Sequence, residues 1–324
     1  MAPHLPKATN TLYFALDSDL ARVPWAAIPI DDQRVLLERF AVATVPHGPF
    51  LREQLEFPRS FTGPESLLLL GDVAYNSPSW PDLPGTRAEL AALISSAPGA
   101  RETLTRTDAS AARLAVALPK ARYAHLGTHG EFKAAEFAAE RKRDLDAARN
   151  WQEGQEGRRF GAKNPLGFVG LVLSGGEVMS GLSIIDLNLD QLKLVTLSAC
   201  ETGLGEFSGG KGVENLQLAF HVAGCPNVVA SLWKISDNAT AALMAKFYHE
   251  LWVNKKPPIE ALREAQLTIY RHPERIPALA GERGKPDLSK TVELKLGAPG
   301  ASATRAQRAP TKLWAAFVLS GVGN

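Results

Sequence analysis

The clearest pattern in the sequence is a series of short apolar runs without polar alternation. Residues 66–73 and 192–197 are rich in Leu and Val, and a glycine or polar segment follows each. Such runs are typical of strands covered on both faces, as in a parallel α/β sheet. Residues 85–94 and the alanine-rich segment ending near Leu118 carry helical patterns between the runs. This alternation predicts a largely parallel sheet with right-handed crossovers.

The same patterns predict elements in the remainder of the chain. Near the N-terminus we expect paired strands within residues 12–30, followed by a helical turn and a strand within 36–45. Further elements are expected at 166–176 (strand and turn), 183–189 (small helix), 213–223 (helix), 227–233 (strand), 237–253 (helix), 258–270 (helix) and 313–319 (a strand that closes the sheet). No tetratricopeptide-like repeat is visible.

Two stretches depart from this order because they are rich in charge, alanine, glycine or proline. Residues 131–163 predict a solvated helix followed by a flexible loop, and residues 271–310 predict a loop or partly disordered segment. The first stretch directly follows a candidate site residue, His129. A second interpretation is therefore that it gates the site or guides a substrate.

Composition excludes several classes of protein. The 324 residues are ample for a large core, and the formal net charge of +2 gives no reason to expect nucleic acid as a partner. The two cysteines, Cys200 and Cys225, do not form a disulfide framework and suit a reducing compartment. The start lacks a signal-peptide pattern, and no uninterrupted apolar run reaches membrane-spanning length. We therefore expect a soluble cytoplasmic protein.

Candidate chemistry lies where two of the predicted strands end. Cys200 follows the apolar run at 192–197, and His129 ends a second short run at 121–128. If these strands are neighbours, an imidazole lies near a thiol, which is the arrangement that a cysteine nucleophile requires. The backbone N–H groups of Gly130 and Cys200 are candidate oxyanion donors. For Cys200 the alternative is a buried packing residue, the common fate of a free cysteine.

These motifs carry a family resemblance. The segments AHLGTHGEF and VTLSACETGLG, followed by GGKGVENLQLAFHVAGCPNVVASLWKISDNAT, closely resemble the CHAT family of caspase-like, separase-related cysteine proteases. The resemblance extends to RVPWAAIPI, LPGTRAELAAL, LREAQLTIY and LWAAFVLSG, and so covers most of the chain. It implies a three-layer αβα sandwich with a mostly parallel central sheet. We expect one domain over 1–324, with a strand-rich part at about 1–62 and a catalytic core at about 63–324.

The resemblance also implies a function. It predicts a cysteine endopeptidase with Cys200 as nucleophile and His129 as general base, acting on a protein substrate without metal or organic cofactor. Because the chain lacks repeats of its own, we expect a separate regulatory or repeat-containing partner, or activation by cleavage in a charged insertion. CHAT proteases resemble parts of prokaryotic defence and cell-death circuits, which makes a role in bacterial immunity plausible. The alternative is a catalytically silent scaffold that binds a partner.

Substrate recognition is predicted for the segment after the strand at 227–233. The resemblance places Ser231, Trp233 and Asp237 at the first substrate pocket, where Asp237 would receive Arg or Lys. The competing interpretation of Asp237 is a helix N-cap, since Asp is an ordinary helix start. Lys234 stands where separases carry a second acid, which counts against basic specificity.

Other candidates are assigned structural roles. His125 is expected to be a packed or hydrogen-bonded residue, Cys225 a packing residue, and Ser198 and Thr202 loop-organising hydroxyls. Glu201 is a weaker candidate for orienting His129. Residues 205–212 satisfy G-x-x-x-x-G-K, but Gly212 occupies the position where a phosphate-binding loop needs Ser or Thr. We therefore disfavour nucleotide hydrolysis.

Overall fold

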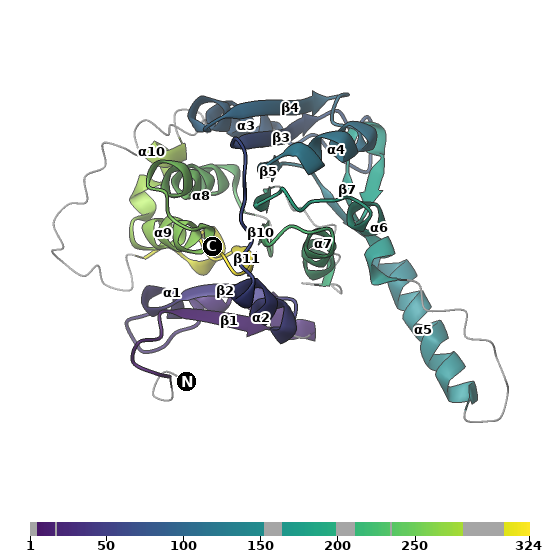
Figure 1. Cartoon of the computed structure of the whole chain (residues 1–324), viewed down its shortest axis with the longest axis horizontal. Helices are drawn as coiled ribbons and strands as arrows, with labels where there is room; N and C mark the ends of the chain where they lie inside the picture. Colours follow the sequence, from purple (N-terminus) through teal and green to yellow (C-terminus); the bar gives the residue numbers. More distant parts are fainter. Residues whose placement is uncertain (1–4, 17, 152–163, 199–210, 234, 281–307) are drawn as a thin grey trace.

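The structure is a computed structural model that describes residues 5–16, 18–151, 164–198, 211–233, 235–280 and 308–324. An eight-stranded sheet lies at its centre (Figure 1). In sheet order the strands are β1 (Thr11–Ala15), β2 (Ala41–Val45), β11 (Phe317–Gly321), β10 (Asn227–Ser231), β9 (Leu194–Leu197), β5 (Tyr123–Leu126), β3 (Ser66–Val73) and β4 (Ala100–Arg106). Every pairing is parallel except that of β10 with β11, which confirms the predicted mostly parallel sheet.

Helices cover both faces of the sheet and make three layers. One face packs against α3 (Pro84–Ser96), α8 (Asp237–Tyr248), α9 (Pro258–Arg271) and α10 (Ile276–Ala280). The other face packs against α4 (Ala111–Ala117), α6 (Gly181–Ile185) and α7 (Lys211–Val222). An apolar core lies between the sheet and the helices on each face. Strand β3 contributes to both cores, because Leu67 and Leu69 enter the first while Leu68 and Leu70 enter the second. An apolar run without alternation thus fills both cores, as expected for a sheet covered on both faces.

The N-terminal part differs from its prediction. Residues 23–28 do not form a strand: a 3₁₀ turn, Trp25–Ala27, follows Pro24, which has no N–H to donate to a sheet. The Trp25 ring stacks on Phe14 of β1 at a centroid distance of 4.7 Å. The apolar residues of this segment therefore pack over β1, and β1 pairs with β2. The predicted helical turn and strand are present as α1 (Leu36–Arg39) and β2.

The last strand, β11, was predicted to close the sheet, but it lies in the interior of the sheet, between β2 and β10. Strand β11 pairs with β10 on one side and with β2 on the other, where Ser320 is opposite Thr44. The C-terminal strand therefore joins the N-terminal pair β1–β2 to the rest of the sheet. Three short or exposed strands had no sequence prediction: edge strand β4, and β6 (Gly130–Phe132) and β8 (Val178–Ser180) of a small antiparallel sheet around β7 (Val169–Val172).

The first charged stretch contains the predicted solvated helix, α5 (Ala134–Trp151), which projects from the body of the molecule (Figure 1). Its base is held by Phe137, whose ring meets those of Phe132 and Phe168. The second charged stretch begins with the short helix α10, which was not predicted. Residues 152–163 and 281–307, where the flexible loops were predicted, lie outside the described residues.

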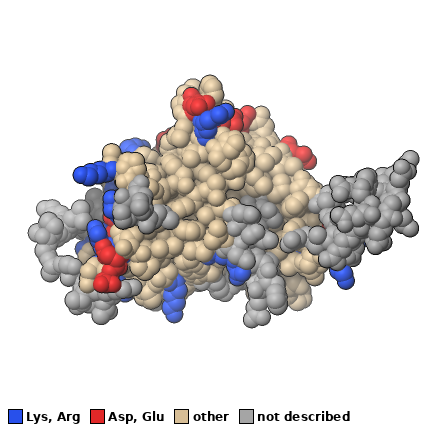
Figure 2. Space-filling view, turned by 90° about the horizontal axis from the view of Figure 1, so that it is seen from below, with Lys and Arg blue, Asp and Glu red and all other residues tan. Residues whose placement is uncertain are grey.

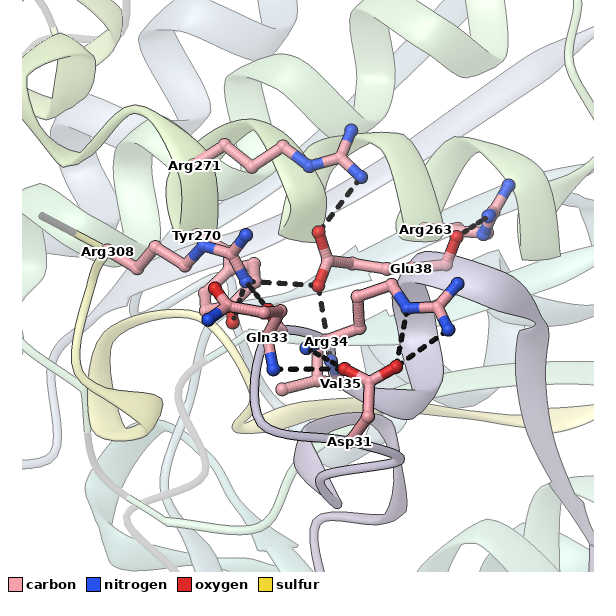
Figure 3. Close-up of polar contacts among 9 residues, drawn as sticks. All are labelled: Asp31, Gln33, Arg34, Val35, Glu38, Arg263, Tyr270, Arg271 and Arg308. Carbon is pink, nitrogen blue, oxygen red and sulfur yellow. Dashed lines mark hydrogen bonds and ion pairs between the residues drawn. The ribbon is translucent and has the colours of Figure 1, made fainter. Parts of the chain in front are cut away.

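A buried carboxylate ties the two ends of the chain together (Figure 3). Glu38 of α1 is only 8% exposed and pairs with Arg308 and Arg271, each at 3.2 Å. The Arg308 guanidinium also donates to the Tyr270 hydroxyl, while Arg263 donates to the carbonyls of Leu37 and Glu38. The segments on both sides of 281–307 are thereby fixed to the N-terminal part.

Two surface properties bear on partners. On the face shown in Figure 2, the described charged side chains of both signs lie mainly at the margins, and uncharged residues occupy the centre. This face therefore offers no continuous basic surface among the residues drawn in colour. Within the described ranges, none of the helices combines the length and the apolar character needed to cross a bilayer.

Candidate functional site

Strands β5 and β9 lead to His129 and Cys200, and they are neighbours in the sheet. They run parallel, with Leu126 of β5 directly opposite Leu197 of β9. His129 follows the first of these residues by three positions, and Cys200 follows the second by three positions. Both segments therefore leave the carboxyl edge of the sheet side by side, the edge at which open α/β sheets gather functional groups. Cys200 itself lies outside the described residues.

The backbone of His129 is fixed on both sides. Its N–H points to the Tyr75 hydroxyl at 3.4 Å, and its carbonyl accepts a hydrogen bond from the Val172 N–H at 2.9 Å. The Tyr75 hydroxyl lies 2.9 Å from the Thr128 Oγ1, and Thr128 in turn donates to the Val172 carbonyl. Burial is the main reason that the pKa of Tyr75 is raised, so this hydroxyl keeps its proton. Residues of β7 and of the segment after β3 thus hold His129 in place.

The His129 ring has a defined orientation. Its Nε2 lies 2.7 Å from the carbonyl oxygen of Pro81, and its centroid lies 4.9 Å from Tyr75 and 5.3 Å from Trp80. A carbonyl only accepts, so Nε2 carries a hydrogen and donates it. In the neutral ring the lone pair is then on Nδ1, which makes Nδ1 the basic atom of this imidazole. The residue is buried, with 1% of its surface exposed.

The turn before α3 presents Trp80 and Pro81. Ser77 and Trp80 form an isolated antiparallel bridge, in which the Trp80 N–H donates to the Ser77 carbonyl. The Ser77 hydroxyl also accepts from the Ser79 N–H, an arrangement that stabilises tight turns. The sequence contained a signal for this turn in the Ser-Pro-Ser-Trp-Pro segment, but nothing in the sequence paired it with His129.

Gly130, a predicted oxyanion donor, begins strand β6 and is buried opposite Leu171 of β7. The second predicted donor, the Cys200 N–H, lies outside the described residues, as do Glu201, Thr202 and the glycine-rich segment 205–210. Of the two predicted donors, only Gly130 therefore lies within the described part of the chain.

The predicted recognition residues follow strand β10. Ser231 ends that strand, is buried and donates its hydroxyl hydrogen to the Trp233 carbonyl at 2.5 Å. The half-buried Trp233 donates its indole N–H to the Lys312 carbonyl at 3.2 Å. The N-cap of α8 is Ser236, so Asp237 is the first helical residue and the N-cap interpretation was one residue off. The side chain of Asp237 and all of Lys234 lie outside the described residues.

The histidine and cysteine assigned structural roles have them. His125 is fully buried, and its Nδ1 lies 2.9 Å from the Tyr248 hydroxyl. Cys225 is a buried free thiol whose Sγ donates to the Asn227 carbonyl, and burial raises its pKa to about 12. A thiol that keeps its proton is a poor nucleophile. Among the described residues, no three His, Cys, Asp or Glu side chains gather as metal ligands.

The sheet, the two helical layers and the paired strand ends define an α/β protein of the caspase-like class. The CHAT domain model matches residues 1–322, and the chain belongs to the CHAT family. No curated protein matches the chain in sequence.

Solved structures of a separase have a similar fold. Two crystal structures of the Saccharomyces cerevisiae separase–securin complex, at 3.0 and 2.6 Å resolution, match with TM-scores of 0.50 and 0.51. The sequence identities are 12% and 13%, and each match covers 96% of this chain. The chain spans only 15% and 16% of the length of those separase chains. The likeness therefore confirms the caspase-like fold and concerns one part of a much larger protein.

Proposed function

We propose that the chain is a cysteine endopeptidase in which Cys200 is the nucleophile and His129 the general base. The observation that carries the proposal is the placement of both residues three positions beyond the paired residues Leu126 and Leu197. The hydrogen bond from His129 Nε2 to the Pro81 carbonyl adds support, because it directs the basic character to Nδ1.

The reaction follows from these roles. His129 Nδ1 takes the proton of the Cys200 thiol, and the thiolate sulfur attacks the carbonyl carbon of the peptide bond. The N–H groups of Gly130 and Cys200 stabilise the oxyanion of the tetrahedral intermediate. The C–N bond then breaks, and the imidazolium gives its proton to the leaving amine. Water, deprotonated by His129, hydrolyses the thioester and restores the thiol.

The substrate is proposed to be a protein, with the first pocket formed by Ser231, Trp233 and Asp237. Ser231 ends β10, the strand next to β9, so the pocket would lie beside the nucleophile. An Asp237 carboxylate in this pocket would favour Arg or Lys at the cleavage position. Lys234 is the residue most able to weaken that preference.

Regulation is proposed to come from a separate protein, or from cleavage in one of the charged insertions. The structurally similar separase is in complex with securin, a protein partner. We further propose that residues 1–324 act as one protease domain in the cytoplasm, within a prokaryotic defence or cell-death pathway. A buried free thiol at Cys225 suits such a reducing compartment.

Mapping of new N-termini tests the proposal. Wild type and the variants Cys200→Ala and His129→Ala are each incubated with a bacterial protein extract, and new α-amino groups are labelled and sequenced. We expect new N-termini with a shared preceding residue in the wild-type sample only. Equal sets of N-termini in all three samples would contradict catalysis and favour the silent scaffold.

A further inference from the structure

Glu89 is a buried carboxylate for which neither the family resemblance nor the proposed chemistry gives a role. It lies on α3, between the apolar residues that face the sheet, and its side chain is 7% exposed. Its Oε1 accepts a hydrogen bond from the Ser198 hydroxyl at 2.6 Å. Burying a carboxylate is costly unless polar groups satisfy it, so the contact with Ser198 is a strong local constraint.

Glu89 belongs to a polar cluster enclosed between the sheet and two helices. The same Oε1 lies 3.4 Å from His125 Nε2, and His125 Nδ1 lies 2.9 Å from the hydroxyl of Tyr248 on α8. Thr196, the partner of His125 across β5 and β9, is also fully buried here. The cluster thus joins α3 and α8 to the two strands that lead to the dyad. Its two hydrogen bonds, from Ser198 to Glu89 and between His125 and Tyr248, constrain how these helices and strands are arranged.

Helix α3 contacts both halves of the proposed site. The segment directly before it supplies the Pro81 carbonyl that holds His129, and Glu89, one and a half turns inside it, holds Ser198. Arg87 fixes the exposed side of the helix to β3 through two 2.9 Å contacts with Asp72. Helix α3 and the segment that leads into it therefore contact both His129 and the residue two places before Cys200.

We propose that Glu89 is a positioning residue, which through Ser198 fixes the start of the segment carrying Cys200 relative to His129. This inference rests on the proposed function, because Cys200 is its target. Loss of the Glu89–Ser198 contact leaves His129 on Pro81 but removes the side-chain hydrogen bond that holds Ser198 to α3. Misplacement by about 1 Å can cost on the order of a hundredfold in rate, so the effect should appear in the chemical step.

The test measures inactivation by a peptide acyloxymethyl ketone and alkylation by iodoacetamide, both mapped to the Cys200 peptide by mass spectrometry. The variants are Glu89→Ala, Glu89→Gln, Ser198→Ala and the double variant Glu89→Ala/Ser198→Ala. Glu38→Ala is the matched control, because Glu38 is an equally buried carboxylate whose partners, Arg271 and Arg308, lie in another cluster. Thermal unfolding is recorded for every variant.

We expect Glu89→Ala and Ser198→Ala to lower the maximal inactivation rate about tenfold or more while the probe concentration for half-maximal rate changes less than about twofold. Glu89→Gln, which keeps an acceptor for Ser198, should recover most of the rate. The double variant should be no slower than either single variant, because both remove the same contact. Glu38→Ala should lower the melting temperature and keep the rate.

Wild-type rates in Glu89→Ala with both reagents would overturn the inference, as would equal rate losses in Glu89→Ala and Glu38→Ala at equal losses of stability. If the peptide probe fails on wild type both with and without a bacterial extract, but iodoacetamide alkylation still slows in Glu89→Ala and Ser198→Ala, the positioning role stands and the protease proposal fails.

Discussion

Acidification should destabilise the packing of α7 through one buried imidazole, His221. This residue is 8% exposed, and its Nδ1 and Nε2 lie 2.8 Å from the Cys225 carbonyl and the Ser320 Oγ. Burial lowers its pKa to about 4 from 6.5, with Arg59 adding a smaller effect of the same sign. The neutral ring therefore joins α7 to the turn before β10 and to β11.

The sign and size follow from proton linkage. A histidine whose pKa is lower in the folded chain than in the unfolded chain contributes to the free energy of unfolding. This contribution is fully present above the unfolded pKa of 6.5. This stabilisation is lost as pH falls toward the folded pKa. Each pKa unit corresponds to about 1.4 kcal/mol, so the loss through His221 totals about 3 kcal/mol at low pH. Between pH 7 and pH 4.5 it amounts to about 2 kcal/mol.

Urea unfolding of wild type and His221→Asn at pH 8, 7 and 4.5 measures this contribution. The variant should be less stable than wild type at pH 7, because the ring bridges two partners. Its loss of unfolding free energy between pH 7 and 4.5 should be smaller than that of wild type by about 2 kcal/mol. Between pH 8 and 7, the two losses should agree. Equal losses down to pH 4.5 would show that His221 does not carry this pH dependence.

Three further predictions concern the close packing at Gly127, the buried ion pair of Arg308 and the thiol of Cys225. Gly127→Ala should lower both activity and stability, the latter by about 1–3 kcal/mol, because its Cβ would lie 3.0 Å from Thr86 Cγ2 on α3; an unchanged melting temperature would contradict this. Arg308→Ala should lower the free energy of unfolding in urea by about 3 kcal/mol, since Glu38 loses a buried partner. A decrease below about 0.5 kcal/mol would show that this ion pair contributes no more than a surface pair. Cys225 should resist iodoacetamide in the folded protein and react only in urea, and labelling of the native chain at equal rates would show that the thiol is not enclosed.

The sequence was most informative where a residue's environment is local. Strands β3, β5 and β9 are apolar runs that fill both cores, so their type and parallel order followed from composition and spacing alone. The same pattern placed His129 just after a strand, but that this strand is the neighbour of the one leading to Cys200 came from the structure. Ser198 was expected to be a loop-organising hydroxyl; in the structure its hydroxyl donates to Glu89, a partner that the sequence did not identify.

The parts that were missed depend on contacts between distant segments. Pro81 lies 48 positions before His129, and Glu89 lies 109 positions before Ser198, so no local period links them. The available signal for Glu89 was a charge on the apolar face of a helix, between Thr86 and Leu90. Strand β11 lies inside the sheet because its pairing with β2 joins the two chain ends, which a strand pattern at 313–319 does not indicate.

The most direct test of the dyad is covalent labelling by peptide acyloxymethyl ketones that end in Arg, Lys or Asp. The probes are applied to wild type, Cys200→Ala and His129→Ala, with and without a bacterial extract as a source of partners. We expect labelling at Cys200 in wild type only, with a preference for the Arg and Lys probes if Asp237 lines the pocket. Labelling of Cys200 by the Asp-terminated probe alone would support the dyad but contradict the proposed pocket with Asp237. Labelling of wild type and His129→Ala at the same rate, or of neither under both conditions, would contradict the dyad.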